Sequence, residues 1–532
     1  MGAVVAAFSG IFRPLARKRA RCDSAGREIE ILCPGCVVSA ADARFRDSAA
    51  IVLTRGEGSS LEVFWVKRGD AVGYMPGFQA FIGGKVAPED REIQMEGAAS
   101  DEDRILRACA VREAFEEAGV LLALDGGSAP GGLDEARRRL LAGEATFDVL
   151  AREHGWRFRA DALVAAGRWT TPPFASQRFD TSFFLARLPE GAEASIVEGE
   201  LESGEWVNPG DALDRWRGGE ATFAAPILHT LRALAEGEES LAERLARAPL
   251  ESGEPVRRIE LKWGIVLHPM QTRPLPPATH TNAYLVGERE MALIDPGSDE
   301  PQELEALFRL IEALSADGRK LAVVLLTHHH PDHAAGVDAV RLRYRVPVAA
   351  HAHTKRHVRL DRTLEDGAEI PLTPGVGEWT LRTLHTPGHA RGHLCFLHER
   401  TRSLFTGDHI PGGAGTVIVD PPEGDMAAYV ASLERLLREP VESLFPGHGS
   451  PQGGAMRRIR WLIGHRMERE AEVLAALTRA PESLAPLVER AYADTKPELW
   501  KYAERSLLAH LIKLEAEGRA VREGERWRRV EE

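Results

Sequence analysis

The stretch LLTHHHPDHAAG, residues 325–336, places four histidines and one aspartate within six positions directly after a run of aliphatic residues. The preceding LAVVLLT predicts a buried strand, so the polar cluster is expected at the carboxyl edge of a sheet, where α/β folds bind ligands. His328 and His330 are two apart in an extended segment, so both side chains can point to the same side. The turn that follows aims Asp332 and His333 at a second, neighbouring point. Imidazole and carboxylate groups are ligands of zinc, and also of iron or manganese.

Three further stretches supply turns that end in a ligand-type residue. HTPGHARGH, residues 385–393, places His389 after a Pro-Gly turn, SLFTGDHI places Asp408 after an apolar run, and SLFPGHGS does the same with His448. Four separate turns of this kind are hard to obtain by chance. The remaining histidines of the region are predicted to be ordinary surface or core residues, with His385 and His393 as candidates for orienting ligands. They are His329, His351, His353, His357, His385, His393 and His409.

The order THHHPDH, TPGH, TGD and PGH resembles the metallo-β-lactamase superfamily over residues 257–453. The resemblance implies an αββα sandwich with metals at one edge of the sheets, and hydrolysis by a hydroxide that two divalent ions generate. Asp332 would both bind metal and handle a proton. Zinc is the expected metal, with iron or manganese as alternatives. By motif position the metal ligands are His328, His330 and His389 for one ion, Asp332, His333 and His448 for the other, and Asp408 as the bridge.

The segments NAYLVG and ALIDPGS, together with the tail, resemble the glyoxalase II-like branch and proteins of this superfamily that carry a winged helix. Members of these groups hydrolyse thioesters or cleave single-stranded RNA. The tail shows three helical segments and a hairpin around Gly524, which predicts a winged-helix shape. Residues 451–532 hold 16 Lys and Arg against 14 Asp and Glu, whereas a nucleic-acid reader would be more basic. A thioester or related ester is therefore the favoured substrate, and a single-strand endoribonuclease is the alternative.

A second constellation is REAFEEAGV, residues 112–120. On a helix Glu113, Glu116 and Glu117 stand at i, i+3 and i+4, so their carboxylates share one face and repel one another. A bound cation would neutralise them, and oxygen ligands of this kind suit magnesium, which also contacts substrate phosphates. The alternative is a solvated acidic helix. The preceding IGGKV and Arg112 extend the pattern beyond three glutamates.

This segment resembles the Nudix box, and RWTTPPFASQRFDTSFFLA, residues 168–186, resembles the branch that includes peroxisomal coenzyme A diphosphatases. The resemblance implies an α/β/α sandwich, magnesium or manganese, and cleavage of a nucleoside-diphosphate-linked substrate such as a coenzyme A derivative. Glu113, Glu116 and Glu117 match the metal ligands, Glu116 with a catalytic role, and Arg112 matches the arginine that fixes the loop-helix geometry. The sequence departs from the box at Arg104, where the family has a glutamate. An insertion over about residues 89–103 interrupts the box, and Glu102 or Asp103 is expected to substitute.

Composition bounds the remaining possibilities. A chain of 532 residues predicts roughly two to four domains, and a net charge of -13 disfavours a broad nucleic-acid footprint. Five cysteines imply no disulfide framework, which fits a reducing, cytoplasmic compartment. Cys33 and Cys36 have zinc-knuckle spacing without a second pair, so ordinary thiols are favoured. No apolar run is long enough to cross a membrane.

We expect a multidomain α/β and α+β protein that acts on small molecules, with nucleic acid not favoured and no membrane partner. A catalytically silent Nudix domain that senses a nucleotide is the alternative to a two-site hydrolase. The predicted divisions are an N-terminal arm at 1–45, a Nudix-like domain at 46–240, a linker at 241–256, a metallo-β-lactamase domain at 257–453 and a winged-helix-like domain at 454–532.

Overall fold

The computed structural model describes residues 45–530, apart from 71, 74, 127–130, 173–174, 176, 198, 238, 247–257, 277, 376 and 414. The predicted N-terminal arm lies almost entirely outside the described residues, and so do Cys33 and Cys36. The described cysteines, Cys109 and Cys395, are buried and free. Within the described residues, no helix combines the length and apolar character required to cross a membrane.

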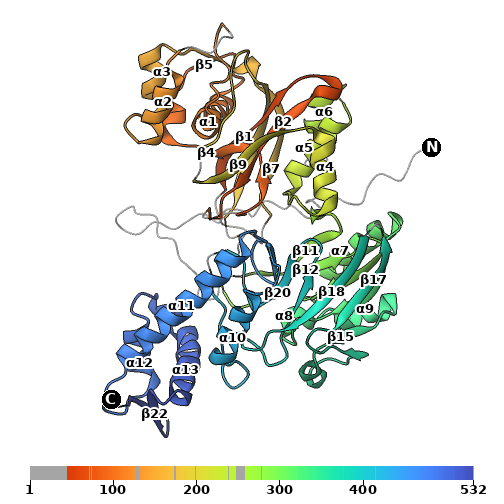
Figure 1. Ribbon diagram of the computed structural model, residues 1–532, viewed down its shortest axis with the longest axis vertical. Helices are drawn as coiled ribbons and strands as arrows, with labels where there is room; N and C mark the ends of the chain where they lie inside the picture. Colours follow the sequence, from red (N-terminus) through yellow and green to blue (C-terminus); the bar gives the residue numbers. More distant parts are fainter. Residues whose placement is uncertain are drawn as a thin grey trace, which may run out of the picture. The chain divides into compact units, whose positions relative to one another are not determined.

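The N-terminal domain is built on a seven-stranded sheet (Figure 1). Its path is β3-β2-β1-β8-β7, with β4 paired to β1 and β9 paired to β2. The central strand β1 is buried over seven consecutive residues, 48–54, of which the middle five are apolar, as expected for a strand that is covered on both faces. The strands are β1 (Arg46–Arg55), β2 (Glu62–Arg68), β3 (Gln79–Ala80), β4 (Ile82–Lys85), β7 (Val164–Thr170), β8 (Phe179–Arg187) and β9 (Leu201–Val207); β5 (Met95–Glu96) and β6 (Phe158–Arg159) form a separate pair.

Two apolar cores lie on the two faces of this sheet. One packs the sheet against α1 (Asp101–Ala118) and α3 (Phe147–His154), with α2 (Leu133–Leu141) beside them. The other packs it against α4 (Pro209–Gly218), α5 (Ala225–Ala235) and α6 (Leu241–Ala246). The domain is therefore the α/β/α sandwich predicted from the sequence. Residues at the start of the predicted linker form α6, and Leu245 is fully buried in the second core.

The central domain consists of two sheets packed face to face. The first has the order β10-β11-β12-β13-β14-β15-β16, and the second has the order β17-β18-β19-β20-β21. Tyr284 from the first sheet meets Phe405 and Phe445 from the second edge to face, with ring centroids 5.2 and 5.8 Å apart. The first sheet comprises β10 (Ile259–Lys262), β11 (Ile265–Gln271), β12 (His280–Val286), β13 (Glu290–Ile294), β14 (Lys320–Leu325), β15 (Val348–Ala350) and β16 (Arg362–Thr363), and the second comprises β17 (Glu369–Gly375), β18 (Gly377–His385), β19 (Leu394–His398), β20 (Ser403–Gly407) and β21 (Ser443–Pro446).

Helices cover the outer faces of both sheets, which completes the predicted αββα sandwich. The first sheet packs against α7 (Pro301–Ala316) and α9 (Val337–Tyr344), with the short α8 (Pro331–Ala334) between them in sequence. The second sheet packs against α10 (Met426–Leu436) and the start of α11 (Ala455–Ala476).

The C-terminal residues form a small helical unit with a hairpin. Helices α11, α12 (Leu484–Ala491) and α13 (Trp500–Ala516) share a core with the hairpin of β22 (Ala520–Glu523) and β23 (Arg526–Arg529). Trp527 on β23 is 1% exposed and anchors the hairpin. This is the winged-helix arrangement expected from the sequence.

The described residues from Phe45 to Val530 belong to one compact unit, and its first two domains are joined by hydrogen bonds. Leu261 on β10 accepts hydrogen bonds from the Phe223 amide at 2.9 Å and from the Trp216 indole at 3.2 Å. The Gly453 amide donates to the Pro76 carbonyl at 2.7 Å. These contacts place β10 directly against the helical face of the N-terminal sheet.

Candidate metal centre

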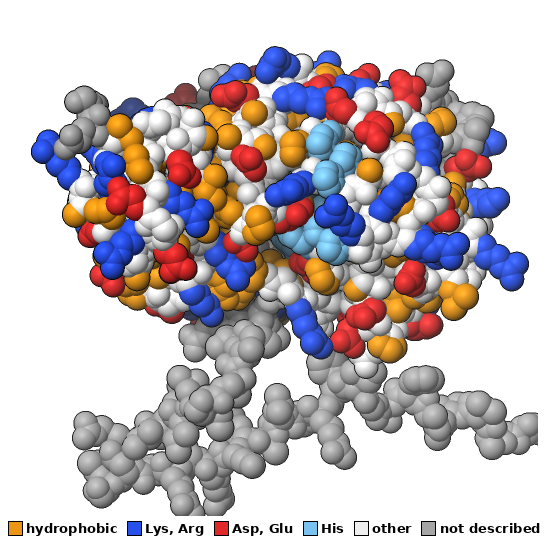
Figure 2. Space-filling view, turned by 90° about the horizontal axis from the view of Figure 1, so that it is seen from below, with side chains coloured by type: hydrophobic (Ala, Val, Ile, Leu, Met, Phe, Trp, Pro, Cys, Tyr) orange, Lys and Arg blue, Asp and Glu red, His pale blue; other side chains and the backbone are white. Residues whose placement is uncertain are grey.

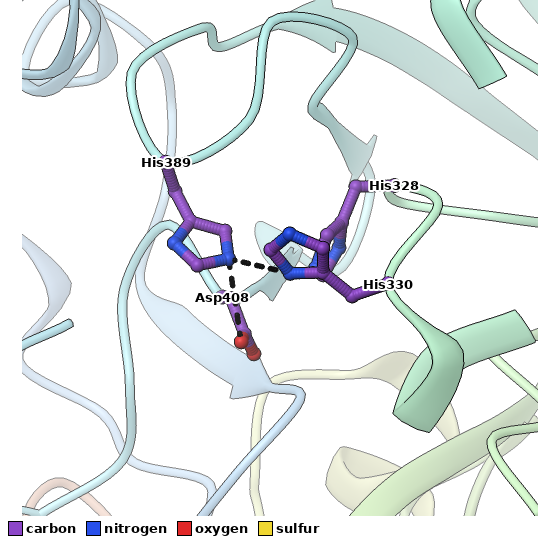
Figure 3. A group of neighbouring side chains, drawn as sticks. All are labelled: His328, His330, His389 and Asp408. Carbon is purple, nitrogen blue, oxygen red and sulfur yellow. Dashed lines mark hydrogen bonds and ion pairs between the residues drawn. The ribbon is translucent and has the colours of Figure 1, made fainter. Parts of the chain in front are cut away.

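Four predicted ligands converge at one point of the central domain (Figure 3). His328 and His330 follow β14, His389 lies in the turn after β18, and Asp408 follows β20. His330 Nδ1 lies 2.9 Å from His328 Nε2 and 3.1 Å from His389 Nε2, and His389 Nε2 lies 3.6 Å from an Asp408 oxygen. A tetrahedral zinc ion with bonds near 2.1 Å holds its ligands about 3.4 Å apart, so these spacings suit one ion.

The other three predicted ligands form a second group beside the first. Asp332 Oδ2 lies 3.3 Å from His448 Nε2. Asp408 Oδ1 lies 3.2 Å from His333 Nε2 and 3.3 Å from His448 Nε2, while its Oδ2 faces His389. The two oxygens of one carboxylate thus face the two groups. All seven residues singled out in the sequence are brought together.

Hydrogen bonds at Nδ1 orient three of the imidazoles. His333 Nδ1 is 2.8 Å from Asp295, His448 Nδ1 donates to the His280 carbonyl at 2.7 Å, and His389 Nδ1 donates to the Ile418 carbonyl at 2.9 Å. A proton held at Nδ1 leaves the Nε2 lone pair facing the cluster, which is the tautomer that binds metal. His333 Nε2 and Asp408 Oδ1 are buried and have no hydrogen-bond partner among the described residues.

Asp295 was not identified from the sequence, although it lies within the ALIDPGS segment. It follows β13 in a left-handed conformation, with φ of 50°, and is 1% exposed. Its oxygens accept from the Thr327 amide at 2.8 Å and hydroxyl at 2.6 Å, and that hydroxyl lies 3.0 Å from His328 Nδ1. One carboxylate therefore supports His333 directly and His328 through Thr327. Its signal in the sequence is the same as for Asp408, an acidic residue directly after an apolar strand.

Burial shapes the charge of the cluster. Desolvation lowers the pKa of His330 to about 3 and holds that of His328 well below its ordinary value. Burial opposes ionisation of Asp408, yet the neighbouring imidazoles of His448 and His333 hold its pKa well below the usual range. Burial also opposes protonation of His333 and His448, yet the charge of Asp408 raises the pKa of both. Metal binding requires neutral imidazoles and ionised carboxylates, so bound cations would displace these protons. The residues present therefore fit two divalent cations.

The histidines predicted to be ordinary residues lie outside both groups. His385 Nε2 bonds the Arg391 carbonyl, and its ring stacks on His351 with centroids 4.4 Å apart. His393 is fully buried and bonds the Thr386 hydroxyl at 2.9 Å. The hydrogen bonds of His385 and His393 do not run to the ligand set; Asp295 and two backbone carbonyls make the orienting contacts.

A cavity of about 720 Å³ opens beside the second group of ligands. Asp332 forms part of its wall. The loop after β13 and the start of α7 supply most of the remainder, and residues 271–273 also line it. Asp332 is thus shared by the cavity wall and the cluster.

In the N-terminal domain the three glutamates lie on α1 against the glycine loop. Glu117 accepts a hydrogen bond from the Gly83 amide at 2.9 Å. A Cβ at Gly84 would lie 2.2 Å from Glu113 Oε1, so only glycine permits this approach. Burial raises the pKa of Glu113 to about 7 and that of Glu117 to about 8. A solvated acidic helix does not fit these buried carboxyl groups.

Arg112 finds its carboxylate partner at Asp90, and not at Glu102 or Asp103, the residues expected to substitute for the family's glutamate. Arg112 donates to Asp90 at 2.8 and 3.1 Å, and also to the Lys85 carbonyl at 2.9 Å. Glu102 instead pairs with Arg168, and Asp103 with Arg107. Asp90 lies near the start of the inserted segment, in the short helix η3 (Pro88–Arg91), and the rest of the insertion packs Ile93 and Met95 into the core before α1 begins. Arg112 and Asp90 are both buried.

Comparison with known proteins matches these features. The family model described as metallo-beta-lactamase superfamily covers residues 276–448, which include all seven ligands. The beta-lactamase-like protein 2 homolog of Drosophila melanogaster is 32% identical over 257 residues, 45% of this chain and 83% of that protein. The chain belongs to the metallo-β-lactamase superfamily. The resemblance of its central domain to that superfamily is thus confirmed.

This chain spans a smaller share of other relatives in the superfamily. A lactamase-like protein of Aspergillus niger is 33% identical over 222 residues, 41% of this chain and 66% of that protein, just under two thirds of its length. An atrochrysone carboxyl ACP thioesterase of Cryptosporiopsis is 32% identical over 200 residues, 37% of this chain and 58% of that protein.

The flanking domains are matched as well. The NUDT19 Nudix domain covers residues 90–234, and the beta-lactamase associated winged helix domain covers residues 483–527. A solved Nudix hydrolase of Alicyclobacillus acidocaldarius is 31% identical and aligns with 39% of this chain and all of that chain, with a TM-score of 0.36. The predicted order of Nudix, metallo-β-lactamase and winged-helix domains is confirmed.

Proposed function

We propose that the central domain is a dinuclear metallohydrolase that cleaves thioesters or related esters. The position of Asp408 carries this proposal, because its two oxygens face two separate groups of three ligands. His328, His330 and His389 would hold one divalent ion, and Asp332, His333 and His448 the other. Zinc suits the imidazole-rich set best, with iron or manganese as alternatives.

The ions would supply a water of lowered pKa and polarise the bond under attack. Residues of the chain would orient the proton and bind the substrate. Asp332 belongs both to the ligand set and to the cavity wall, so its carboxylate is the candidate group for orienting a proton of the attacking water. The cavity of about 720 Å³ is within the range of small-molecule sites. A relative named as a thioesterase supports the choice of bond.

Metal analysis combined with a substrate screen tests this proposal. The purified protein is expected to contain about two metal ions per chain and to hydrolyse an acyl thioester, with activity lost after chelation and restored by added zinc. A labelled single-stranded RNA in the same assay tests the alternative activity. Chelator-sensitive cleavage of RNA, with no turnover of any thioester, would replace the thioesterase proposal.

We infer that the N-terminal domain hydrolyses a nucleoside-diphosphate-linked substrate, such as a coenzyme A derivative, with magnesium or manganese. The buried face of Glu113 and Glu117 against the glycine loop, with the more exposed Glu116 beside it, supports this inference. Arg112 fixes the loop to the helix through Lys85 and Asp90, and magnesium prefers oxygen ligands together with substrate phosphates.

Glu116→Gln separates catalysis from sensing. We expect the substitution to abolish pyrophosphate cleavage while nucleotide binding and central hydrolysis persist. A wild-type domain that binds nucleotide without turning it over, and whose ligand changes the rate of central hydrolysis, would instead identify a sensor module.

A further inference from the structure

A second cavity lies where the first two domains meet. It has a volume of about 190 Å³, and its walls come from both domains. The N-terminal domain supplies strands and the start of α5. The central domain supplies Ile259 and Leu261 on β10, Leu267 on β11, and Ser450 and Pro451 just beyond His448. The backbone bonds at Leu261 and Gly453 hold these walls together.

The chemistry of the lining is aromatic, with a few polar groups. Phe78, Trp169, Phe179 and Phe183 contribute their rings, and Gln79 supplies an amide. Gln79 Oε1 accepts from the Thr222 amide at 2.8 Å, which leaves the NH₂ end of its side chain for another acceptor. An apolar cavity of about 150 Å³ binds benzene, so this cavity accepts a flat ring system of somewhat greater size.

Two basic residues lie near both the cavity and the site of the acidic helix. Arg68 lines the cavity, and its guanidinium opposes the burial that raises the pKa of Glu117. Lys85 lies 5.9 Å above the ring of Phe179, and its carbonyl accepts from Arg112. Arg68 and Lys85 thus connect the surroundings of the aromatic cavity with those of the glutamates. A ligand with its phosphates at the glutamates would pass Arg68 and Lys85 before its organic part entered the cavity.

We propose that this cavity binds the aromatic base of the nucleotide whose diphosphate is held at the acidic helix, so that the central domain completes the substrate site of the Nudix domain. A base stacks on aromatic side chains through its face and meets polar groups at its edge, which matches the four rings and the amide of Gln79. The proposal rests on the pyrophosphohydrolase function proposed above and specifies the part of the substrate that sets its affinity.

Binding to the full-length Glu116→Gln protein in the presence of magnesium tests the proposal without turnover. The probes are ADP, inorganic pyrophosphate and hexyl diphosphate, and the reporter is the emission of Trp169, identified by comparison with a Trp169→Phe variant. We expect ADP to change this emission and to bind at least about tenfold more tightly than pyrophosphate, since stacking on aromatic side chains contributes about 1–3 kcal/mol per base.

Two substitutions probe the two walls. Ala225→Leu fills the cavity from α5, and Ile259→Ala removes part of the wall contributed by the central domain. Each is expected to weaken ADP binding about tenfold, in line with loss of one stacked base, while pyrophosphate binding is retained and shows that the site is folded. Ala142→Leu and Ile512→Ala, at exposed positions outside the cavity, are the matched controls.

Equal affinity for ADP and pyrophosphate, or an unchanged ADP affinity in both wall variants, overturns the proposal. A response of Trp169 to hexyl diphosphate but not to ADP overturns it in favour of an alkyl group. Failure of the pyrophosphohydrolase function would appear separately, as wild-type protein that binds ADP and pyrophosphate with magnesium but cleaves no nucleoside-diphosphate-linked substrate.

Discussion

The two candidate sites are assembled in opposite ways. In the central domain seven ligands come from four turns spread over 121 positions, from His328 to His448, and each turn is intact in the sequence. In the Nudix domain the glutamates lie on one helix, yet the partner of Arg112 is Asp90, which lies within the inserted segment. A site whose parts each carry a local sequence motif can be predicted without knowledge of the fold. A site that depends on a contact from an inserted segment cannot be predicted in this way.

The largest expected effect concerns the carboxylate between the two metal groups. Asp408→Asn removes the negative charge that both groups share, so metal content is expected to fall from about two ions to one or fewer. Thioester hydrolysis should fall by about a thousandfold or more, the scale of losing an electrostatic contributor to catalysis. Metal analysis and initial rates measure both, with pyrophosphate cleavage as the internal control. Full metal content and activity would refute the bridging role.

The next effect concerns the buried pair of the Nudix domain. Asp90→Ala leaves the Arg112 guanidinium buried without its main partner, and removing one member of a buried pair costs about 3–5 kcal/mol. Chemical denaturation is expected to show this loss in the transition of the N-terminal domain. Glu102→Gln, which removes an exposed ion pair with Arg168, is the control and should change the free energy of unfolding by less than about 1 kcal/mol. Comparable losses in both variants would contradict the assignment of Asp90.

A smaller effect is expected at the carboxylate that supports two ligands. Asp295→Asn retains the size of the side chain but weakens the hold on His333, and loss of such supporting partners lowers metal affinity about 10- to 100-fold. Competition with a chelator measures the affinity of each ion. The ion at His333 should weaken more than the ion at His389, whose support comes from the Ile418 carbonyl. Equal weakening at both positions would show that the effect is not local.

The smallest effect is a pH dependence of the Nudix domain. Burial raises the pKa of Glu113 to about 7 and of Glu117 to about 8. Without a divalent metal the folded state therefore holds protons that the unfolded state releases, and the free energy of unfolding falls as pH rises from about 4.5 to 8. Magnesium affinity rises over the upper part of this range because ionised carboxylates bind it. Calorimetry at several pH values, with and without magnesium, measures both trends; a metal-free stability that rises with pH would contradict them.

Sequence patterns predicted the fold class, the domain order and the seven residues that converge in the central domain. They did so because residues such as His328 and Asp408 follow apolar strands whose ends share one edge of the sheets. Asp295 and Asp90 were missed because their roles depend on partners 32 and 22 positions away. The helix α6 was assigned to a linker because its short, charged sequence does not reveal that Leu245 fills a core.

The interface between the first two domains has a consequence for engineering this protein. Gly77 and Gly453 touch backbone to backbone, and a Cβ on either would come within 3 Å of the other. Phe78, which belongs to the N-terminal half by sequence, is packed among core residues of the central sandwich. Replacing one of these domains by that of a homologue would thus require Gly77, Gly453 and Phe78 to be kept as a set. Either domain produced alone would expose an apolar surface to water.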